Sequence, residues 1–265
     1  MKKLHGQANF EHGRGGKTGV LLCNLGTPEA PTSSAVRRYL AEFLADPRVV
    51  ELPRVLWLPL LHGVILNTRP RRSAHAYQKI WQADGSPLLL LSQALTDSVK
   101  QQCDEDDAVG TKLEFALGMR YGKPSIASAL QHLLDADVRR ILVLPLYPQY
   151  ANATTASAHD AVFDFCRRQR WIPQLRFVTD YHALPAYIDA LADSVRDYWT
   201  EHGRGQRLLM SFHGIPKDTF LAGDPYFCQA QATARLLAEK LELEFGAWQL
   251  SFQDRKSTRL NSCHD

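Results

Sequence analysis

Short apolar runs alternate with longer amphipathic segments along most of the chain. The first run, residues 18–26, ends in glycine and is typical of a buried strand. After it, residues 32–46 place apolar side chains three and four positions apart behind Thr32, which predicts a helix with a capping residue. The same patterns predict strands over 112–122, 139–150, 174–181, 206–216 and 248–253, and helices over 86–102, 124–137, 155–169, 185–203 and 225–244. Because strands alternating with helices of this length form βαβ units, the sequence predicts an α/β fold with parallel sheets.

The most apolar segment, residues 55–68, allows two interpretations. Its 14 residues carry no charged side chain, but they are fewer than the roughly 20 that a membrane-spanning helix needs. One interpretation is a core helix kinked at Pro59. The other is an exposed element in which Trp57 and the flanking Arg54 and Arg69 suit a membrane surface.

Composition and charge narrow the class of protein. The formal net charge is only +3, and we expect no nucleic-acid partner because no basic cluster stands out. The five cysteines are scattered and form no Cys-x-x-Cys pair, which argues against a zinc site. Separate reduced thiols are typical of a cytoplasmic protein, and we expect that location.

Two glycine-containing segments do not have the context of a nucleotide-binding loop. Residues 13–19 lie before the first strand instead of after it, and Glu11 occupies the position of the first glycine of a phosphate loop. The turn after the first strand has the single glycine Gly26, so the dinucleotide fingerprint is absent. A nucleotide-binding α/β module is therefore disfavoured.

The predicted strand ends carry the side chains that are best suited to bind a ligand or take part in a reaction. In parallel α/β sheets, ligands bind outside the carboxyl ends of the strands. A flat, anionic, aromatic ligand suits a set of aromatic, cationic and hydroxyl side chains at that edge. This set comprises Arg120, Tyr121, Tyr147, Tyr150, Asn152, Thr154, Thr155 and His213.

Six segments resemble, in order and spacing, the ferrochelatase family. They are VLLCNLGTPEA (20–30), GSPLLLLS (85–92), LGMRYGKPSI (117–126), VLPLYPQYANATTAS (143–157), LLMSFHGIP (208–216) and GDPY (223–226). The resemblance implies two doubly wound, Rossmann-like parallel-sheet domains with a porphyrin in the cleft between them. It also implies a lyase that inserts ferrous iron into protoporphyrin IX to form protohaem, the last step of haem biosynthesis. Ferrous iron is then a co-substrate, and no bound cofactor is expected.

The resemblance also assigns roles to individual residues. It implies that His213 is the catalytic histidine, which binds the metal or takes a pyrrole proton. Tyr147, Arg120 and Tyr121 match residues that touch the macrocycle, and Leu25 falls near the metal, where it offers an apolar contact. The positions that hold the porphyrin propionates match Arg69, Arg72 and Ser86. Residues of about 49–70 match an apolar lip that covers the porphyrin and is a candidate for peripheral contact with the inner face of the membrane.

The sequence predicts one full domain and one incomplete domain. We expect a first α/β domain over 17–204, which contains the lip, and an incomplete second domain over 205–253. Residues 254–265 do not continue the family pattern and are expected to be a non-native, disordered tail. No glutamate follows Glu244, so the acidic partner that the family places opposite the histidine is missing, and we expect poor solubility and little activity. Two alternatives stay open: a chelatase for another metal or tetrapyrrole, and a non-catalytic porphyrin-binding fragment.

Overall fold

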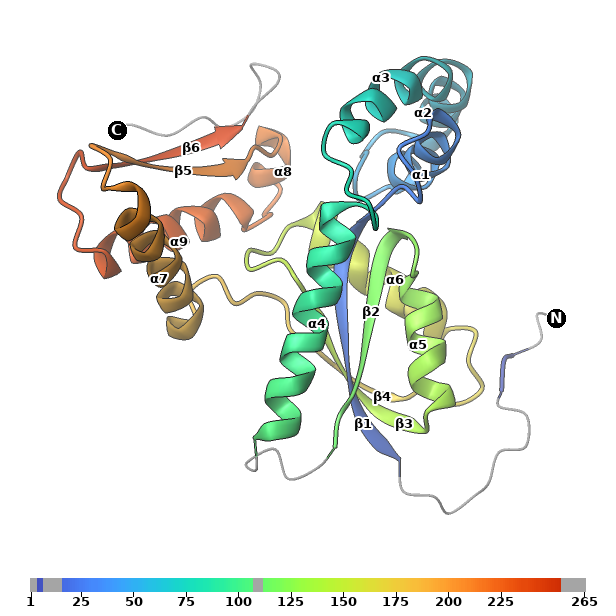
Figure 1. Ribbon diagram of the computed structural model, residues 1–265. Helices are drawn as coiled ribbons and strands as arrows, with labels where there is room; N and C mark the ends of the chain where they lie inside the picture. Colours follow the sequence, from blue (N-terminus) through green and yellow to red (C-terminus); the bar gives the residue numbers. More distant parts are fainter. Residues whose placement is uncertain (1–3, 7–15, 107–111, 254–265) are drawn as a thin grey trace. The chain divides into compact units, whose positions relative to one another are not determined.

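The computed structural model describes residues 4–6, 16–106 and 112–253, which form two compact units (Figure 1). The first unit holds the chain up to Leu146 together with Asn152–Thr179. The second holds Tyr147–Ala151 and the chain from Asp180 onward. The predicted disordered tail, 254–265, lies outside the described residues.

A four-stranded parallel sheet forms the centre of the first unit. Its strand order is β2-β1-β3-β4, so the first strand of the chain lies inside the sheet. Leu21, Leu22 and Cys23 of the first strand are 0% exposed, because the sheet is covered on both faces. The strands are β1 (Lys17–Thr27), β2 (Glu114–Gly122), β3 (Val138–Pro145) and β4 (Gln174–Phe177). The predicted α/β class and parallel pairing are confirmed.

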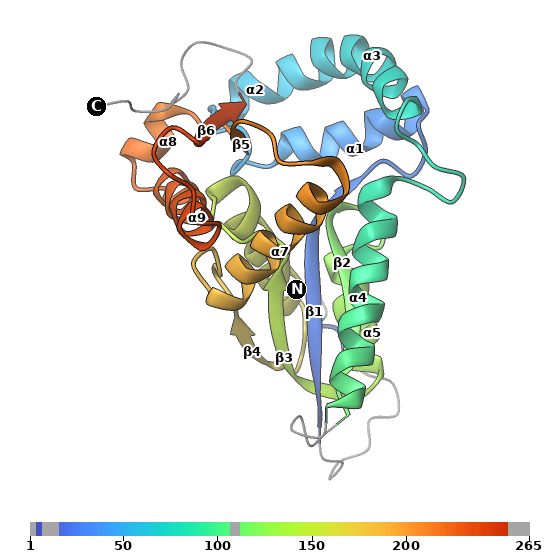
Figure 2. The same cartoon turned by 60° about the vertical axis from the view of Figure 1, so that its left-hand side comes forward.

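Helices lie on opposite faces of this sheet. Leu21 and Cys23 of β1 point into a core built with α5 (Ile126–Asp135) and α6 (Ser157–Cys166). Because side chains alternate along a strand, Asn24 points to the other face, where its Nδ2 donates to Ser92 Oγ at 2.9 Å. Ser92 belongs to α4 (Pro87–Glu105), which runs along β1 and β2 (Figure 2). Helices on both faces of a parallel sheet are the doubly wound arrangement.

Side-chain caps fix where three helices of this unit begin. Thr32 Oγ1 accepts a hydrogen bond from the backbone N–H of Ala35 at the start of α1 (Ser33–Ala45). Ser86 Oγ accepts from the N–H of Leu89, and Pro87 occupies the first position of α4. Ser125 caps α5 in the same way. The predicted starts at Thr32 and Ser86 are confirmed.

The apolar segment is helical and has one buried and one exposed face. It forms α2 (Arg54–Leu60), the π-helix η1 (Leu61–Ile65) and the start of α3 (Leu66–Gln78). Trp57, Leu61 and Leu66 are buried together with Leu44 of α1. The expectation that Trp57 lies at an exposed interface is therefore wrong, because its ring is needed to pack this helix onto α1. The opposite face meets solvent, and its exposed large apolar side chains are Val55, Leu56, Leu60 and Val64.

The described residues of the second unit form a two-stranded parallel sheet and three helices. β5 and β6 pair in register from Leu208 opposite Trp248 to His213 opposite Gln253. Between the strands the chain forms α8, which the sequence pattern did not predict, and α9. The elements are α7 (Pro185–His202), β5 (Leu208–His213), α8 (Lys217–Leu221), α9 (Tyr226–Lys240) and β6 (Trp248–Gln253).

The division between the units lies one helix earlier than the boundary predicted at 204/205. Ala192 of α7 is 0% exposed in a core that it shares with Met210 of β5 and Leu237 of α9. This packing makes α7 part of the second unit, which begins at Asp180. The short segment Tyr147–Ala151 also belongs there, although it connects two elements of the first unit.

Candidate functional site

A cluster of hydrogen bonds surrounds Asp46 in the first unit, at the carboxyl end of β2. Asp46 Oδ2 accepts from Arg120 Nη2 at 2.5 Å, from Tyr121 OH at 2.8 Å and from Ser157 Oγ at 2.6 Å. Its Oδ1 accepts from the backbone N–H of Arg48 at 2.8 Å. The side chain of Asp46 is only 4% exposed, so these bonds replace the water that a carboxylate otherwise binds.

The charges of this cluster are fixed by its hydrogen bonds. Burial by itself raises the pKa of Asp46, but the hydrogen bonds from Ser157, Arg48 and Tyr121 and the positive charge of Arg120 outweigh it and leave the pKa below its usual value. Burial raises the pKa of Tyr121 well above its usual value, so the phenol stays neutral and donates to Asp46. The cluster therefore holds an ionised Asp46 against a cationic Arg120.

Arg120 and Tyr121, both predicted to touch a ligand, have different environments. The guanidinium of Arg120 lies 4.5 Å above the centre of the Tyr121 ring, and the Arg120 side chain is 19% exposed. Tyr121 is 0% exposed and packs edge-on against Phe43, with ring centres 5.1 Å apart. Arg120 can reach a ligand from this position. Tyr121 supports Arg120 from inside the unit, which differs from the direct contact that the sequence predicted.

Leu25 lies at the same edge of the sheet, on the neighbouring strand. The register pairs Asn24 with Met119 and Gly26 with Tyr121, which sets Leu25 beside Arg120. The approach is close: a Cβ on Gly26 would lie 1.8 Å from the Tyr121 carbonyl oxygen, and its φ of 101° favours glycine. Leu25 is half-buried and adds an apolar side chain at the strand position beside Arg120.

The three residues predicted to hold propionates differ in availability. Arg69 and Arg72 are exposed on α3 and lie three residues apart, so they share a face of the helix. Both can meet an anionic group without losing an internal contact. Ser86 is 3% exposed and its hydroxyl caps α4, so its oxygen already serves the fold.

His213 and Tyr147 belong to the second unit. Met210 is buried on the core face of β5, whereas His213, the last residue of the strand, and Ser211 are exposed on the other face. The backbone N–H of His213 donates to Tyr226 OH at 3.2 Å, which ties the strand end to α9. Tyr147 is half-buried at the start of the segment Tyr147–Ala151.

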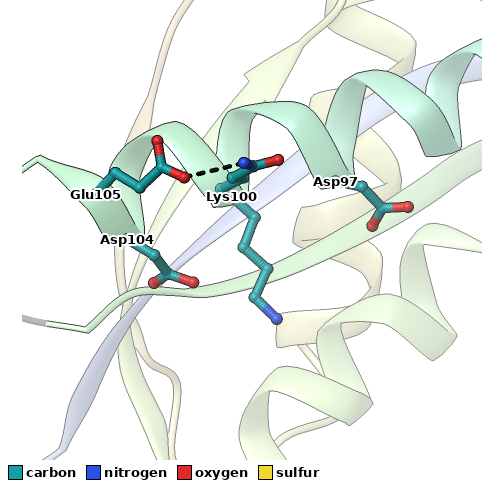
Figure 3. Close-up of a pocket in the computed structure, with 5 residues that line it drawn as sticks. Asp97, Lys100, Asp104 and Glu105 are labelled. Carbon is teal, nitrogen blue, oxygen red and sulfur yellow. Dashed lines mark hydrogen bonds between the residues drawn. The ribbon is translucent and has the colours of Figure 1, made fainter.

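The described residues do not carry two other kinds of functional element. They contain no group of three or more His, Cys, Asp or Glu side chains that could hold a metal ion. Within the same residues, no helix is both long enough and apolar enough to cross a membrane. A surface hollow of about 300 Å³ lies along α4 (Figure 3), but it contains none of the predicted site residues. Its lining residues are Asp97, Lys100, Gln101, Asp104 and Glu105.

The sequence pattern missed Asp46 and Ser157. Asp46 reads as the residue that ends a helix, and Ser157 as an ordinary residue of a helical first turn. Neither is a strand-end residue, and only the fold shows that both meet Arg120 from different elements.

Comparisons with known proteins agree on one family. A family model described as ferrochelatase matches residues 17–260. The chain is 54% identical over 253 residues to a ferrochelatase of Thioalkalivibrio sulfidiphilus, covering 96% of this chain and 68% of the relative. It is 52% identical over 250 residues to that of Nitrosococcus oceani (94% and 67%). It is 47% identical over 251 residues to that of Marinobacter nauticus (95% and 67%). The chain thus spans about two thirds of the length of these relatives.

Proposed function

Because this chain belongs to the ferrochelatase family, it carries the ferrochelatase function in haem biosynthesis, and we propose how its residues serve that reaction. Its substrates are a porphyrin and ferrous iron, and the porphyrin we propose is protoporphyrin IX. Iron acts as co-substrate, with no resident cofactor. The observation that carries the assignment of residues is the register of β1 and β2, which sets Leu25 and Arg120 side by side at the carboxyl edge of a parallel sheet.

The reaction needs a group that handles iron or the two pyrrole protons, and we assign this to His213. A neutral imidazole can bind ferrous iron or accept a proton at physiological pH. His213 is exposed at the end of β5, where a flat ring can approach it. His213 is thus proposed as the residue that meets ferrous iron on its way into the porphyrin or takes a pyrrole proton.

The remaining assigned residues bind and orient the porphyrin. Arg69 and Arg72 offer exposed guanidinium groups to the propionates, a pairing that can be bidentate. Leu25 and Tyr147 supply apolar and aromatic surface to the macrocycle. Ser86 contributes to this site by fixing the start of α4, because its hydroxyl is the N-terminal cap of that helix.

The lip is proposed to contact the inner face of the cytoplasmic membrane. Val55 and Leu56 of α2 are 81% and 70% exposed, which is costly in water unless something covers them. The neighbouring helix α3 adds the exposed Arg71, whose charge favours an anionic lipid surface. An apolar ridge beside a basic helix suits a peripheral contact with lipid.

A second candidate is porphyrin binding without metal insertion. A third is insertion of another metal, such as cobalt, or use of another tetrapyrrole.

One experiment separates the three candidates. The purified chain is mixed anaerobically with protoporphyrin IX and ferrous iron, and absorbance is followed. Haem formation, lost in His213→Ala but kept in the exposed control His202→Ala, supports the proposed function. A porphyrin shift without haem supports binding alone. Cobalt insertion without iron insertion supports the other metal.

A further inference from the structure

Asp46 lies at the centre of the bonds that hold Arg120, and no motif in the sequence assigns it a role. Its Oδ2 accepts from Arg120, Tyr121 and Ser157, and its Oδ1 accepts from the backbone of Arg48. A buried carboxylate with both oxygens bonded has one orientation. Asp46 therefore provides a rigid acceptor for the guanidinium of Arg120.

The guanidinium of Arg120 is held along one edge and over one face. Nε donates to Ser157 O at 2.8 Å and to Ser157 Oγ at 2.6 Å, and Nη2 donates to Asp46. The ring of Tyr121 lies under the guanidinium. Among the residues that the structure describes, none accepts a hydrogen bond from Nη1. Nη1 is thus the one guanidinium nitrogen of Arg120 without a hydrogen-bond acceptor among the described residues, on a side chain that is 19% exposed.

We propose that Asp46, assisted by Ser157, is the positioning residue for Arg120, and that together they aim Nη1 at the bound porphyrin. This inference rests on the proposed function, because it requires Arg120 to contact the porphyrin. Asp46 also neutralises the charge of Arg120. Arg120 therefore offers the porphyrin an oriented hydrogen-bond donor and adds no net positive charge to the site. The net positive charge for the propionates then comes from exposed residues such as Arg69 and Arg72.

A double-mutant cycle on porphyrin binding tests this assignment. Protoporphyrin IX is titrated into the unsubstituted chain, Asp46→Asn, Arg120→Gln and the double variant, and quenching of tryptophan fluorescence gives the dissociation constant. Each single substitution is expected to weaken binding about tenfold, the effect of losing one hydrogen bond of a charged group. The double variant is expected to bind no more weakly than Arg120→Gln alone, because Asp46 acts through Arg120.

A purely structural Asp46 gives a different result. Asp46→Asn would then weaken binding by the same factor with and without Arg120, and this additivity would overturn the inference. The exposed ion pair Asp193–Arg196 of α7 supplies matched controls, Asp193→Asn and Arg196→Gln, which are expected to leave binding unchanged.

A milder variant covers the case in which Asp46→Asn does not fold. Ser157→Ala removes one bond to Arg120 Nε and keeps the other, to the Ser157 carbonyl oxygen. It is expected to weaken binding about threefold when Arg120 is present and not at all in Arg120→Gln. Equal weakening in both backgrounds would overturn the inference. If the unsubstituted chain binds no porphyrin, the proposed function fails, and Arg120 has no ligand to be positioned for.

Discussion

The indole Nε1 of Trp57 donates a hydrogen bond of 2.6 Å to the carbonyl oxygen of Leu44, the penultimate residue of α1. Trp57 is 8% exposed, whereas its neighbour Leu56 is 70% exposed. One turn of α2 therefore carries a buried anchor and an exposed apolar side chain next to each other. The core-helix interpretation therefore holds for the face of this segment that carries Trp57, while the opposite face is exposed, as the lip hypothesis requires.

Trp57→Ala is expected to lower the free energy of unfolding of the first unit by about 3 kcal/mol. The substitution removes a large buried ring and leaves a cavity against Leu61 and Leu66. Urea unfolding followed by circular dichroism measures the change. Leu56→Ala is the matched control and is expected to cost less than about 0.5 kcal/mol, because its side chain is already in water. Equal losses in the two variants would contradict this division of the helix.

The exposed face of the lip is expected to bind vesicles that contain anionic lipid. Val55→Glu with Leu56→Glu places carboxylates on that face, and flotation with such vesicles is expected to fall at least about fivefold. Trp57 is left intact, so the packing of α2 on α1 is kept. Leu221→Glu, an exposed apolar residue of the second unit, is the control and should float like the unsubstituted chain. Unchanged flotation of the double variant would remove the case for a membrane contact through the lip.

Asp46 is expected to make the stability of the first unit depend on pH in acid. Its pKa in the folded chain is lowered, so its contribution is fully present above the unfolded pKa of about 3.9 and is lost as pH falls toward the folded value. Above about pH 5 the unsubstituted chain should therefore melt at a higher temperature than Asp46→Asn, and the gap should narrow below that pH. Thermal melts from pH 7 to pH 3 measure the gap.

The matched control for this titration is Asp193→Asn, which changes an exposed aspartate. Its melting temperature should stay close to that of the unsubstituted chain at every pH, because a surface ion pair contributes little. A gap between the unsubstituted chain and Asp46→Asn that is constant from pH 7 to pH 3 would show that Asp46 does not titrate with a lowered pKa.

The sequence predicted most of the regular elements, although it missed α8, and it placed Leu25 and Arg120 at strand ends. Hydrophobic spacing and capping residues such as Thr32 and Ser86 are local signals, so they predicted the helix starts correctly. The sequence did not show that Trp57 is buried, because an indole ring suits both a protein core and a membrane interface. Asp46 was missed for a related reason: its partners, Arg120 and Ser157, are 74 and 111 residues away in the chain.

Domain membership also depends on contacts between distant parts of the chain. The polar, glycine-rich residues 201–206 suggested a boundary, but α7 before them packs on α9 after them. Composition at a linker does not report which core the preceding helix joins. Contacts between distant parts of the chain also make Tyr147–Ala151 part of the second unit, because side chains of α9 form hydrogen bonds with that segment.

The bond between Gln229 and Tyr150 is expected to hold the segment that carries Tyr147. Gln229 Oε1 accepts from the Tyr150 N–H at 2.7 Å, and Gln149 Nε2 donates to Thr233 Oγ1 at 2.9 Å. Gln229→Ala removes the acceptor of the Tyr150 amide, so hydrogen exchange of a peptide spanning 147–151 should speed up severalfold as that segment opens more often. Mass spectrometry of the exchanged peptides measures this. Gln231→Ala, two residues along α9 and exposed, should leave the exchange unchanged. Equal exchange in the Gln229→Ala and Gln231→Ala variants would mean that Gln229 does not hold the segment.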